Sequence, residues 1–313
     1  MREPTVPRLR SDAGFTLIEV MVTTLIMLTV SGVVITGVLN MTQLNNTVTN
    51  RSAMFAGVRN ATALLQQEVG QAGRVTLPAA VTATGNAAVG ATTLTVSSVE
   101  DMFVGEYLVI GTGDNLETVA VSGINGTTLT FATAFEHIHA ANEPVTVQGA
   151  FGNGVVPKHK ADGTVAANGS TDTVLKIFGD INGSGQMVYV EYTCDLANNV
   201  LYRNQMDFDL APPKVAPGVE QILVENVQPN PGNAACFTYQ EETIANDVFV
   251  IGVAITLTVR SQNRDPITQE FQQESKALLN VSPRNVFNAW QMYSLQLYNR
   301  VQPTPPATAL LLP

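Results

Sequence analysis

Residues 14–39 read GFTLIEVMVTTLIMLTVSGVVITGVL, and this stretch decides how the chain is organised. The 25 residues from Phe15 to Leu39 contain a single charged side chain, Glu19. A helix rises 1.5 Å per residue, so the stretch would extend about 37 Å, enough to cross the hydrocarbon core of a bilayer. We therefore predict that residues 15–39 form a membrane-spanning helix.

The basic residues around this helix predict its orientation. Arg2, Arg8 and Arg10 precede it, and the next basic residue is Arg51. The positive-inside rule then places the amino terminus in the cytoplasm and the bulk of the chain on the other side of the membrane. A secretory signal peptide is a poor alternative, because its apolar stretch is only about 7–15 residues long and ends at a small-residue cleavage site.

Glu19 is costly in this position. A carboxylate in lipid costs about 2.5 kcal/mol or more at the bilayer centre, and less near the interface. Cleavage before Phe15 would create an α-amine whose positive charge could pair with Glu19 and offset that cost. A plain membrane anchor does not explain the carboxylate.

The run from Gly14 to Val20, after a short basic leader (residues 1–14) and before an apolar helix, resembles the type IV prepilin signature. The resemblance implies that a prepilin peptidase cuts between Gly14 and Phe15 and methylates the amine of Phe15. It also implies that Glu19 sets the register with other pilins during filament assembly. The protein would lie first in the inner membrane and then in a cell-surface pilus.

The helical pattern continues through residues 40–74, with no proline before Pro78. We predict one helix of about 55–60 residues, whose outer half packs on a sheet through an apolar stripe. The stripe consists of Met41, Leu44, Val48, Phe55, Val58, Leu65 and Val69.

Residues 80–150 alternate apolar and polar positions in five short runs separated by turns, which predicts an inserted β-rich module, a small barrel or sandwich. An adhesive role and a passive decoration are both open for it. The runs are Thr92–Ser97, Glu106–Gly111, Glu117–Ser122, Thr127–Ala132 and Pro144–Gln148.

Residues 151–285 hold six further strand candidates, which favour one antiparallel sheet lying across the helix. The fold class is then α+β, with a long helix on an antiparallel sheet domain. Residues 199–204 and 253–261 are similar to segments of PilW-type minor pilins. The candidates are Thr173–Phe178, Met187–Thr193, Asn199–Arg203, Val219–Val227, Val248–Arg260 and Ile267–Leu279.

The last segment of the sequence is residues 286–313. Val286–Arg300 has helical spacing and predicts an amphipathic helix packed on the domain, with a partner-binding helix as the alternative. Pro303–Pro313 is rich in proline, and we expect a mobile tail.

The two cysteines, Cys194 and Cys236, are expected to form a disulfide if this part is exported, and two separate buried thiols are the alternative. One weak metal candidate has the spacing of a calcium loop, although a hairpin turn explains the same residues; it comprises Asp180, Asn182, Ser184, Gly185 and Glu191. His137 and His139 could hold zinc only with further ligands, so a surface pair is the simpler interpretation.

Net charge and the absence of enzyme motifs narrow the functions that the sequence allows. The formal net charge of −10 disfavours binding to nucleic acid, which needs clustered Lys and Arg. No motif of an enzyme active site is present. The leading hypothesis is a minor pilin without a cofactor. The alternatives are a pseudopilin of a type II secretion system, a tip-displayed adhesive module, and an anchored envelope protein that never assembles.

Overall fold

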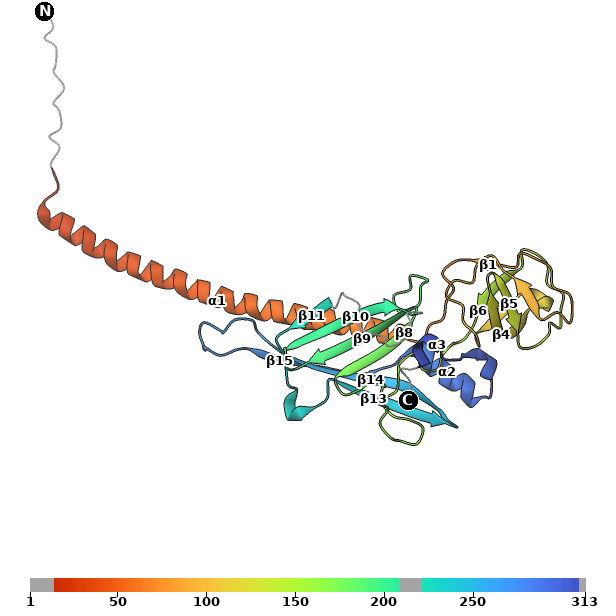
Figure 1. Cartoon of the computed structure of the whole chain (residues 1–313). Coiled ribbons are helices and arrows are strands. Elements are labelled where there is room, and N and C mark those ends of the chain that lie inside the picture. Colours follow the sequence, from red (N-terminus) through yellow and green to blue (C-terminus); the bar gives the residue numbers. More distant parts are fainter. Residues whose placement is uncertain (1–13, 209–220, 310–313) are drawn as a thin grey trace, which may run out of the picture.

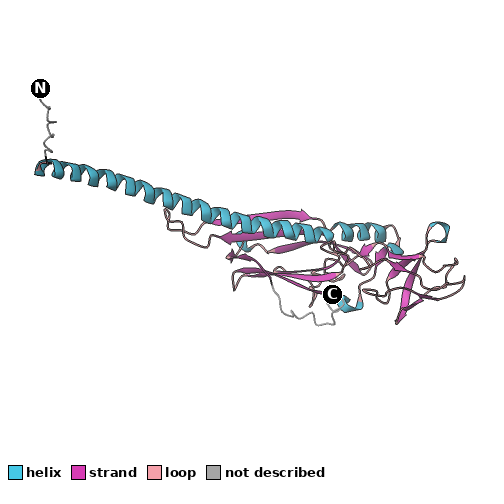
Figure 2. Cartoon of the chain, turned by 90° about the horizontal axis from the view of Figure 1, so that it is seen from above, coloured by secondary structure: helices cyan, strands magenta, loops and turns pink. Residues whose placement is uncertain are grey.

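A computed structural model describes residues 14–208 and 221–309. Three parts follow one another along the molecule: a projecting helix, a domain of two sheets, and a small barrel at the end farthest from the amino terminus (Figures 1 and 2). This arrangement confirms the α+β class, with a long helix followed by antiparallel sheets.

Helix α1, Leu17–Gln71, has 55 residues, which confirms the predicted length. It ends where the chain must pass close to its neighbours: Gly73 has φ +81°, and a Cβ there would lie 2.9 Å from the carbonyl oxygen of Phe151. A residue with a side chain would be strained at this position, so glycine allows the helix to stop and the chain to turn.

Only the carboxyl-terminal part of α1 is packed. The predicted stripe is therefore wrong in its first half: Met41, Leu44 and Val48 are 75%, 55% and 64% exposed, and Phe55 is 41% exposed. Regular spacing shows that a face is apolar but does not show what covers it. The buried residues of the helix are Met54, Val58, Ala61, Thr62, Leu65, Glu68 and Val69.

The strands form two four-stranded antiparallel sheets, where the sequence predicted one. The first has the order β11-β10-β9-β8 and comprises Gln221–Glu225, Val200–Asp207, Val188–Asp195 and Val174–Gly179. The second has the order β12-β14-β13, with β15 also pairing with β14; it comprises Val227–Gln228, Asp247–Arg260, Phe237–Ile244 and Gln273–Val281. The break falls at Asn226 (φ +60°), which divides the predicted strand 219–227 between the two sheets.

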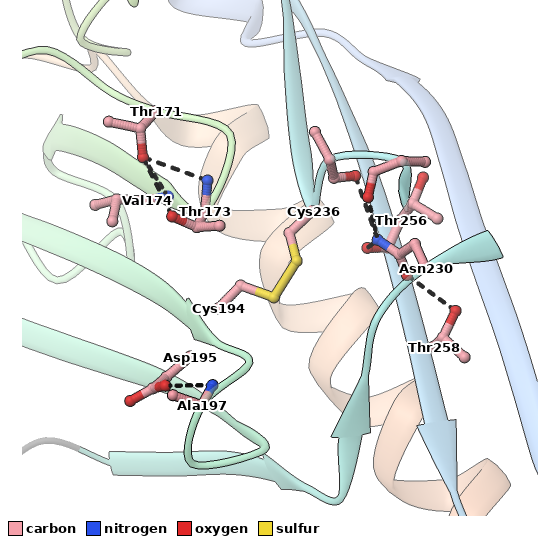
Figure 3. Close-up of a disulfide and its surroundings, with 12 residues drawn as sticks. Thr171, Thr173, Val174, Cys194, Asp195, Ala197, Asn230, Cys236, Thr256 and Thr258 are labelled. Atoms are coloured by element: carbon pink, nitrogen blue, oxygen red, sulfur yellow. Dashed lines mark hydrogen bonds between the residues drawn. A yellow bond between two sulfur atoms is a disulfide. The ribbon is translucent and has the colours of Figure 1, made fainter. Parts of the chain in front are cut away.

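A disulfide links the two sheets. Cys194 lies in β9 of the first sheet and Cys236 directly precedes β13 of the second, with 6.5 Å between their Cα atoms (Figure 3). Both cysteines are buried in the same core as the packed face of α1. The predicted pairing is confirmed, and closing this loop stabilises the fold by about 4 kcal/mol in the chain-entropy model.

The inserted module is a closed six-stranded barrel with its own core. Its strand order is β1-β6-β3-β4-β5-β2, and hydrogen bonds from Thr84 N to Thr95 O (2.8 Å) and from Ser97 N to Thr82 O (2.9 Å) join the two ends. All five predicted strands are present, and closure removes the sheet edges. The strands are Val81–Thr82, Thr93–Thr95, Tyr107–Ile110, Glu117–Asn125, Thr128–Phe131 and Pro144–Val147, numbered β1 to β6. A short 3₁₀ helix, η1 (Gly113–Asn115), precedes β4.

The carboxyl-terminal segment joins the barrel to the sheets. β16, Val301–Gln302, pairs in parallel with β7, Ala150–Phe151. The buried side chain of Gln302 bonds to both backbone groups of Tyr107 (2.9 and 2.8 Å) and to Gln148 O (2.9 Å) in the barrel. Pro305 and Thr308 are buried and residues Pro306–Ala309 form helix α3, so the expected mobile tail is wrong for this segment. Residues 310–313 lie outside the described residues.

The predicted helix 286–300 is shorter than expected. Helix α2 spans Arg284–Ser294 and is followed by a 3₁₀ turn, Tyr298–Arg300 (η3). Gln296 has φ +62°, and the bonds from Leu297 N to Met292 O and from Gln296 N to Tyr293 O form a Schellman cap. Another 3₁₀ turn, η2 (Pro231–Asn233), precedes Cys236.

Candidate functional site: the amino-terminal helix

The predicted processing site precedes α1. Phe15 is 86% exposed, and a Cβ built on Gly14 would meet no atom within 4 Å. The peptide bond between them is therefore open to an enzyme. Residues 1–13 of the predicted leader lie outside the described residues.

Glu19 takes part in the amino-terminal cap of the helix. Its Oε2 accepts hydrogen bonds from Thr16 N (2.9 Å) and Thr16 Oγ1 (3.0 Å), while Glu19 N donates to Thr16 Oγ1 (3.3 Å). This is a capping box, which satisfies two otherwise unpaired donors at the helix start. The capping box was not among the predictions from sequence, although Thr16-x-x-Glu19 is its signature. The cap directs the Glu19 carboxylate toward the chain end that cleavage would create.

The following residues are suited to an apolar environment. An 18-residue window of α1 has a mean hydropathy of 2.2 and no buried residue, so the helix is long and apolar enough to cross a membrane. Its threonine hydroxyl groups bond to the backbone of the same helix: Thr23 donates to Glu19 O and Thr36 donates to Gly32 O, both at 2.8 Å. Satisfying polar groups within the helix is what a lipid environment demands.

The packed part of α1 is fixed by a buried ion pair. Arg203 of β10 binds Glu68 at two points, Nη2 to Oε1 (2.7 Å) and Nε to Oε2 (3.1 Å), and the hydroxyl of Tyr192 also donates to Glu68. Glu68 is 3% and Arg203 is 8% exposed. Although burial alone would lower it, Glu68 keeps the pKa of Arg203 above its usual value. The pair holds the helix in one register on the first sheet.

The calcium-loop candidate forms a hairpin turn. The Asp180 carboxylate accepts from Gly185 N (3.3 Å) and lies 3.5 Å from Arg74 Nε, while Asn182 accepts from Ser184 N (3.1 Å). Glu191 accepts from the Tyr189 hydroxyl and stands opposite Lys176. Val188 lies opposite Gly179, so Glu191 is three positions away along the strand, about 10 Å. Calcium binding stays a prediction that these contacts do not favour.

The expected surface pair of His137 and His139 is wrong for His139, which is completely buried, while His137 is partly exposed. Both ring nitrogens of His139 face glutamate oxygens, and Nδ1 of His159 lies 2.6 Å from Glu241 Oε2. Within residues 14–208 and 221–309, no group of three or more His, Cys, Asp or Glu side chains could hold a metal ion.

The comparisons with known proteins agree with the geometry at the amino terminus. Residues 9–35 match the family model described as the prokaryotic N-terminal methylation motif. No curated protein and no solved structure matches the chain significantly. The matched residues contain the exposed Gly14–Phe15 bond, the Thr16–Glu19 cap and the apolar start of α1. Residues 9–35 are therefore similar to the amino-terminal motif of type IV prepilins.

Proposed function

We propose that this protein is a minor pilin, cleaved by a prepilin peptidase between Gly14 and Phe15, methylated at Phe15 and incorporated in a type IV pilus. The observation that carries the proposal is the methylation motif on a helix whose apolar side chains are exposed as far as Val48. Exposed apolar surface of this extent needs a partner. Lipid covers it before assembly, with the amino terminus in the cytoplasm, and the helices of other pilins cover it afterwards.

The role of Glu19 follows from its position. Cleavage would remove the chain before Phe15 and leave a positive amine near the carboxylate that Thr16 already directs to the helix end. In a filament, the same carboxylate pairs with the amine of a neighbouring subunit. That pairing fixes the axial position of each new subunit.

The barrel favours a minor rather than a repeating subunit. It lies beyond the end of α1, on the side of the sheets away from the projecting helix (Figure 1). A filament assembled at the membrane moves outward, so this side of a subunit faces the subunit ahead of it. A barrel there obstructs a subunit in front, which favours the leading end of the filament and a role in starting assembly.

The domain boundaries belong to this proposal. The leader is residues 1–14, the membrane half of the helix is 15–39, and the outer half is 40–74. The barrel is residues 80–150, the pilin-like sheet domain is 151–285, and the closing segment is 286–313.

Purified filaments test this function. We expect the chain in the filament fraction, with an antibody against the barrel labelling one end. Glu19→Ala should be cleaved normally yet be absent from filaments, while the control Thr23→Ala should be incorporated. Label at regular intervals along the filament would contradict a minor pilin, and normal incorporation of Glu19→Ala would contradict the assembly role.

A pseudopilin of a type II secretion system shares the same amino-terminal features. Deleting the gene distinguishes the two functions, because loss of secretion with normal pili would favour the pseudopilin. An adhesive barrel at the tip is a further candidate, favoured by its distal position. Replacing residues 81–147 by a short linker should then abolish adhesion and leave pili intact.

A further inference from the structure

His139 lies at the centre of a buried cluster in the barrel, which we call the His139 cluster: His139, Glu117 and Glu143. The imidazole is completely buried. Its Nε2 is 2.6 Å from Glu117 Oε1, and its Nδ1 is 2.8 Å from Glu143 Oε2. Each ring nitrogen therefore faces a carboxylate oxygen at hydrogen-bonding distance.

Each of the two contacts needs one proton between its nitrogen and its oxygen. Although burial alone would raise it, hydrogen bonds from Glu136 N, the His139 ring and His137 N keep the pKa of the Glu117 carboxyl below its usual value. Glu117 is then an ionised acceptor and Nε2 must carry a proton. A neutral ring would present the lone pair of Nδ1 to the oxygen of Glu143, which is repulsive when that carboxylate is ionised. A proton on Nδ1 removes this conflict.

The cluster joins three loops, which we call the distal loops: residues 83–92, 111–116 and 132–143. Glu117 directly follows the second loop, and His139 and Glu143 belong to the third. The first loop is held by the backbone of His139, which exchanges hydrogen bonds with Ala87 (2.8 and 2.9 Å). The chain enters and leaves the barrel at residues 80 and 148, at the opposite end of strands β1 and β6, so these loops lie away from the sheets.

Among the residues that the structure describes, His139 has no other partner of opposite charge. The first loop contains no titratable residue, and the second contributes only Asp114, which is exposed. The third contributes Glu136, whose side chain is exposed, and His137, both through their backbone N–H groups to Glu117. The Phe135 ring lies edge-on at 4.8 Å between centroids, and the backbone of Gly111 closes another side.

We propose that His139 is an imidazolium that donates to Glu117 and Glu143 at once. The second of its ring protons, the one on Nδ1, then holds the distal loops together. Loss of the proton at alkaline pH leaves a lone pair against a carboxylate in a buried site. The distal loops then open while the barrel strands stay paired. The surface at the far end of the molecule is therefore ordered in a pH-dependent way.

The test combines two measurements on the full chain in detergent. The ¹⁵N shifts of labelled histidine report whether Nδ1 and Nε2 are both protonated, and amide exchange reports the protection factors of the distal loops. We expect both nitrogens of His139 to be protonated at pH 7. As pH rises, protection of the distal loops should fall about tenfold or more, the size expected for losing a charge-assisted hydrogen bond, with the same midpoint as the ¹⁵N shift.

Two variants keep the test decisive. Glu143→Gln offers an amide that can donate to a neutral Nδ1, so His139 should become neutral at lower pH and loop protection should lose its pH dependence. His137→Gln is the matched control, since no hydrogen bond joins its side chain to a described residue, and it should behave as the unmodified protein. A neutral Nδ1 at pH 7, or loop opening whose midpoint differs from the ¹⁵N titration, would overturn the proposal.

Discussion

The two parts of α1 differ in what surrounds them. In the projecting half, residues 17–53, apolar side chains such as Leu28 (72% exposed) and Leu44 (55%) touch nothing that covers them. In the packed half, residues 54–71, Leu65 is completely buried and Glu68 is bound by Arg203. One continuous helix thus serves two environments: its packed half belongs to the folded domain, and its projecting half is reserved for lipid or for other subunits.

Among the changes considered, removing the buried ion pair should lower the free energy of unfolding the most, because it loosens the packed half of α1. Glu68→Ala leaves the Arg203 guanidinium buried without its carboxylate, so we expect the free energy of unfolding to fall by about 3–5 kcal/mol. Denaturant titration of the full chain in detergent measures it. The double variant Glu68→Gln/Arg203→Met removes both charges and should lose much less; equal losses would show that the pair does not act as a unit.

Truncating one leucine in each half tests the contrast directly. Leu65→Ala should lower the free energy of unfolding by about 2–5 kcal/mol, because it leaves a cavity in a packed core. Leu44→Ala, the matched control, should change it by less than about 0.5 kcal/mol, as is usual for exposed positions. Similar losses at the two positions would mean that the projecting half is packed on the domain.

The barrel holds a buried acid, Glu106, for which no ion pair is found within residues 14–208 and 221–309. Burial raises the pKa of Glu106 to about 8, with a further contribution from Asp101. The folded state keeps this proton between about pH 4.5 and 8 and the unfolded state releases it, so stability should fall by about 1.4 kcal/mol per pH unit in that window.

Glu106→Gln should remove this part of the pH dependence. The measurement is the free energy of unfolding from pH 5 to 8 for both proteins, since other titrating groups cancel in the difference. Parallel curves for the two proteins would contradict a protonated Glu106.

The smallest effect is expected at the helix cap. Thr16→Ala removes the side-chain half of the capping box, which costs about 1 kcal/mol and should speed amide exchange of residues 17–20 by about fivefold. The global free energy of unfolding should not change, because the projecting half does not contact the core. Thr23→Ala lacks a capping role and should leave these amides as they are.

Much of the architecture could be predicted from local patterns. The apolar run predicts α1, and alternation predicts the five barrel strands, because both depend on neighbouring residues. Export to an oxidising compartment also predicts the disulfide between Cys194 and Cys236. At the site, Gly14, Phe15 and Glu19 stand out because they form one contiguous motif.

Other features depend on residues far apart in the sequence. The pair Glu68–Arg203 spans 135 positions, and neither residue is marked locally as a partner of the other. The division into two sheets depends on the positive φ of Asn226, which its type permits but does not require. Strand β13 was missed because Glu241 and Glu242 interrupt its alternation. The capping box could have been found, since its signature is local.

If the projecting half of α1 is the processed helix of a pilin, the mature amino terminus must differ between cells with and without prepilin peptidase. Mass spectrometry of that terminus in the two strains measures this. We expect a chain that begins at N-methylated Phe15 when the peptidase is present and at residue 1 or 2 when it is absent. The same unprocessed amino terminus in both strains would contradict it.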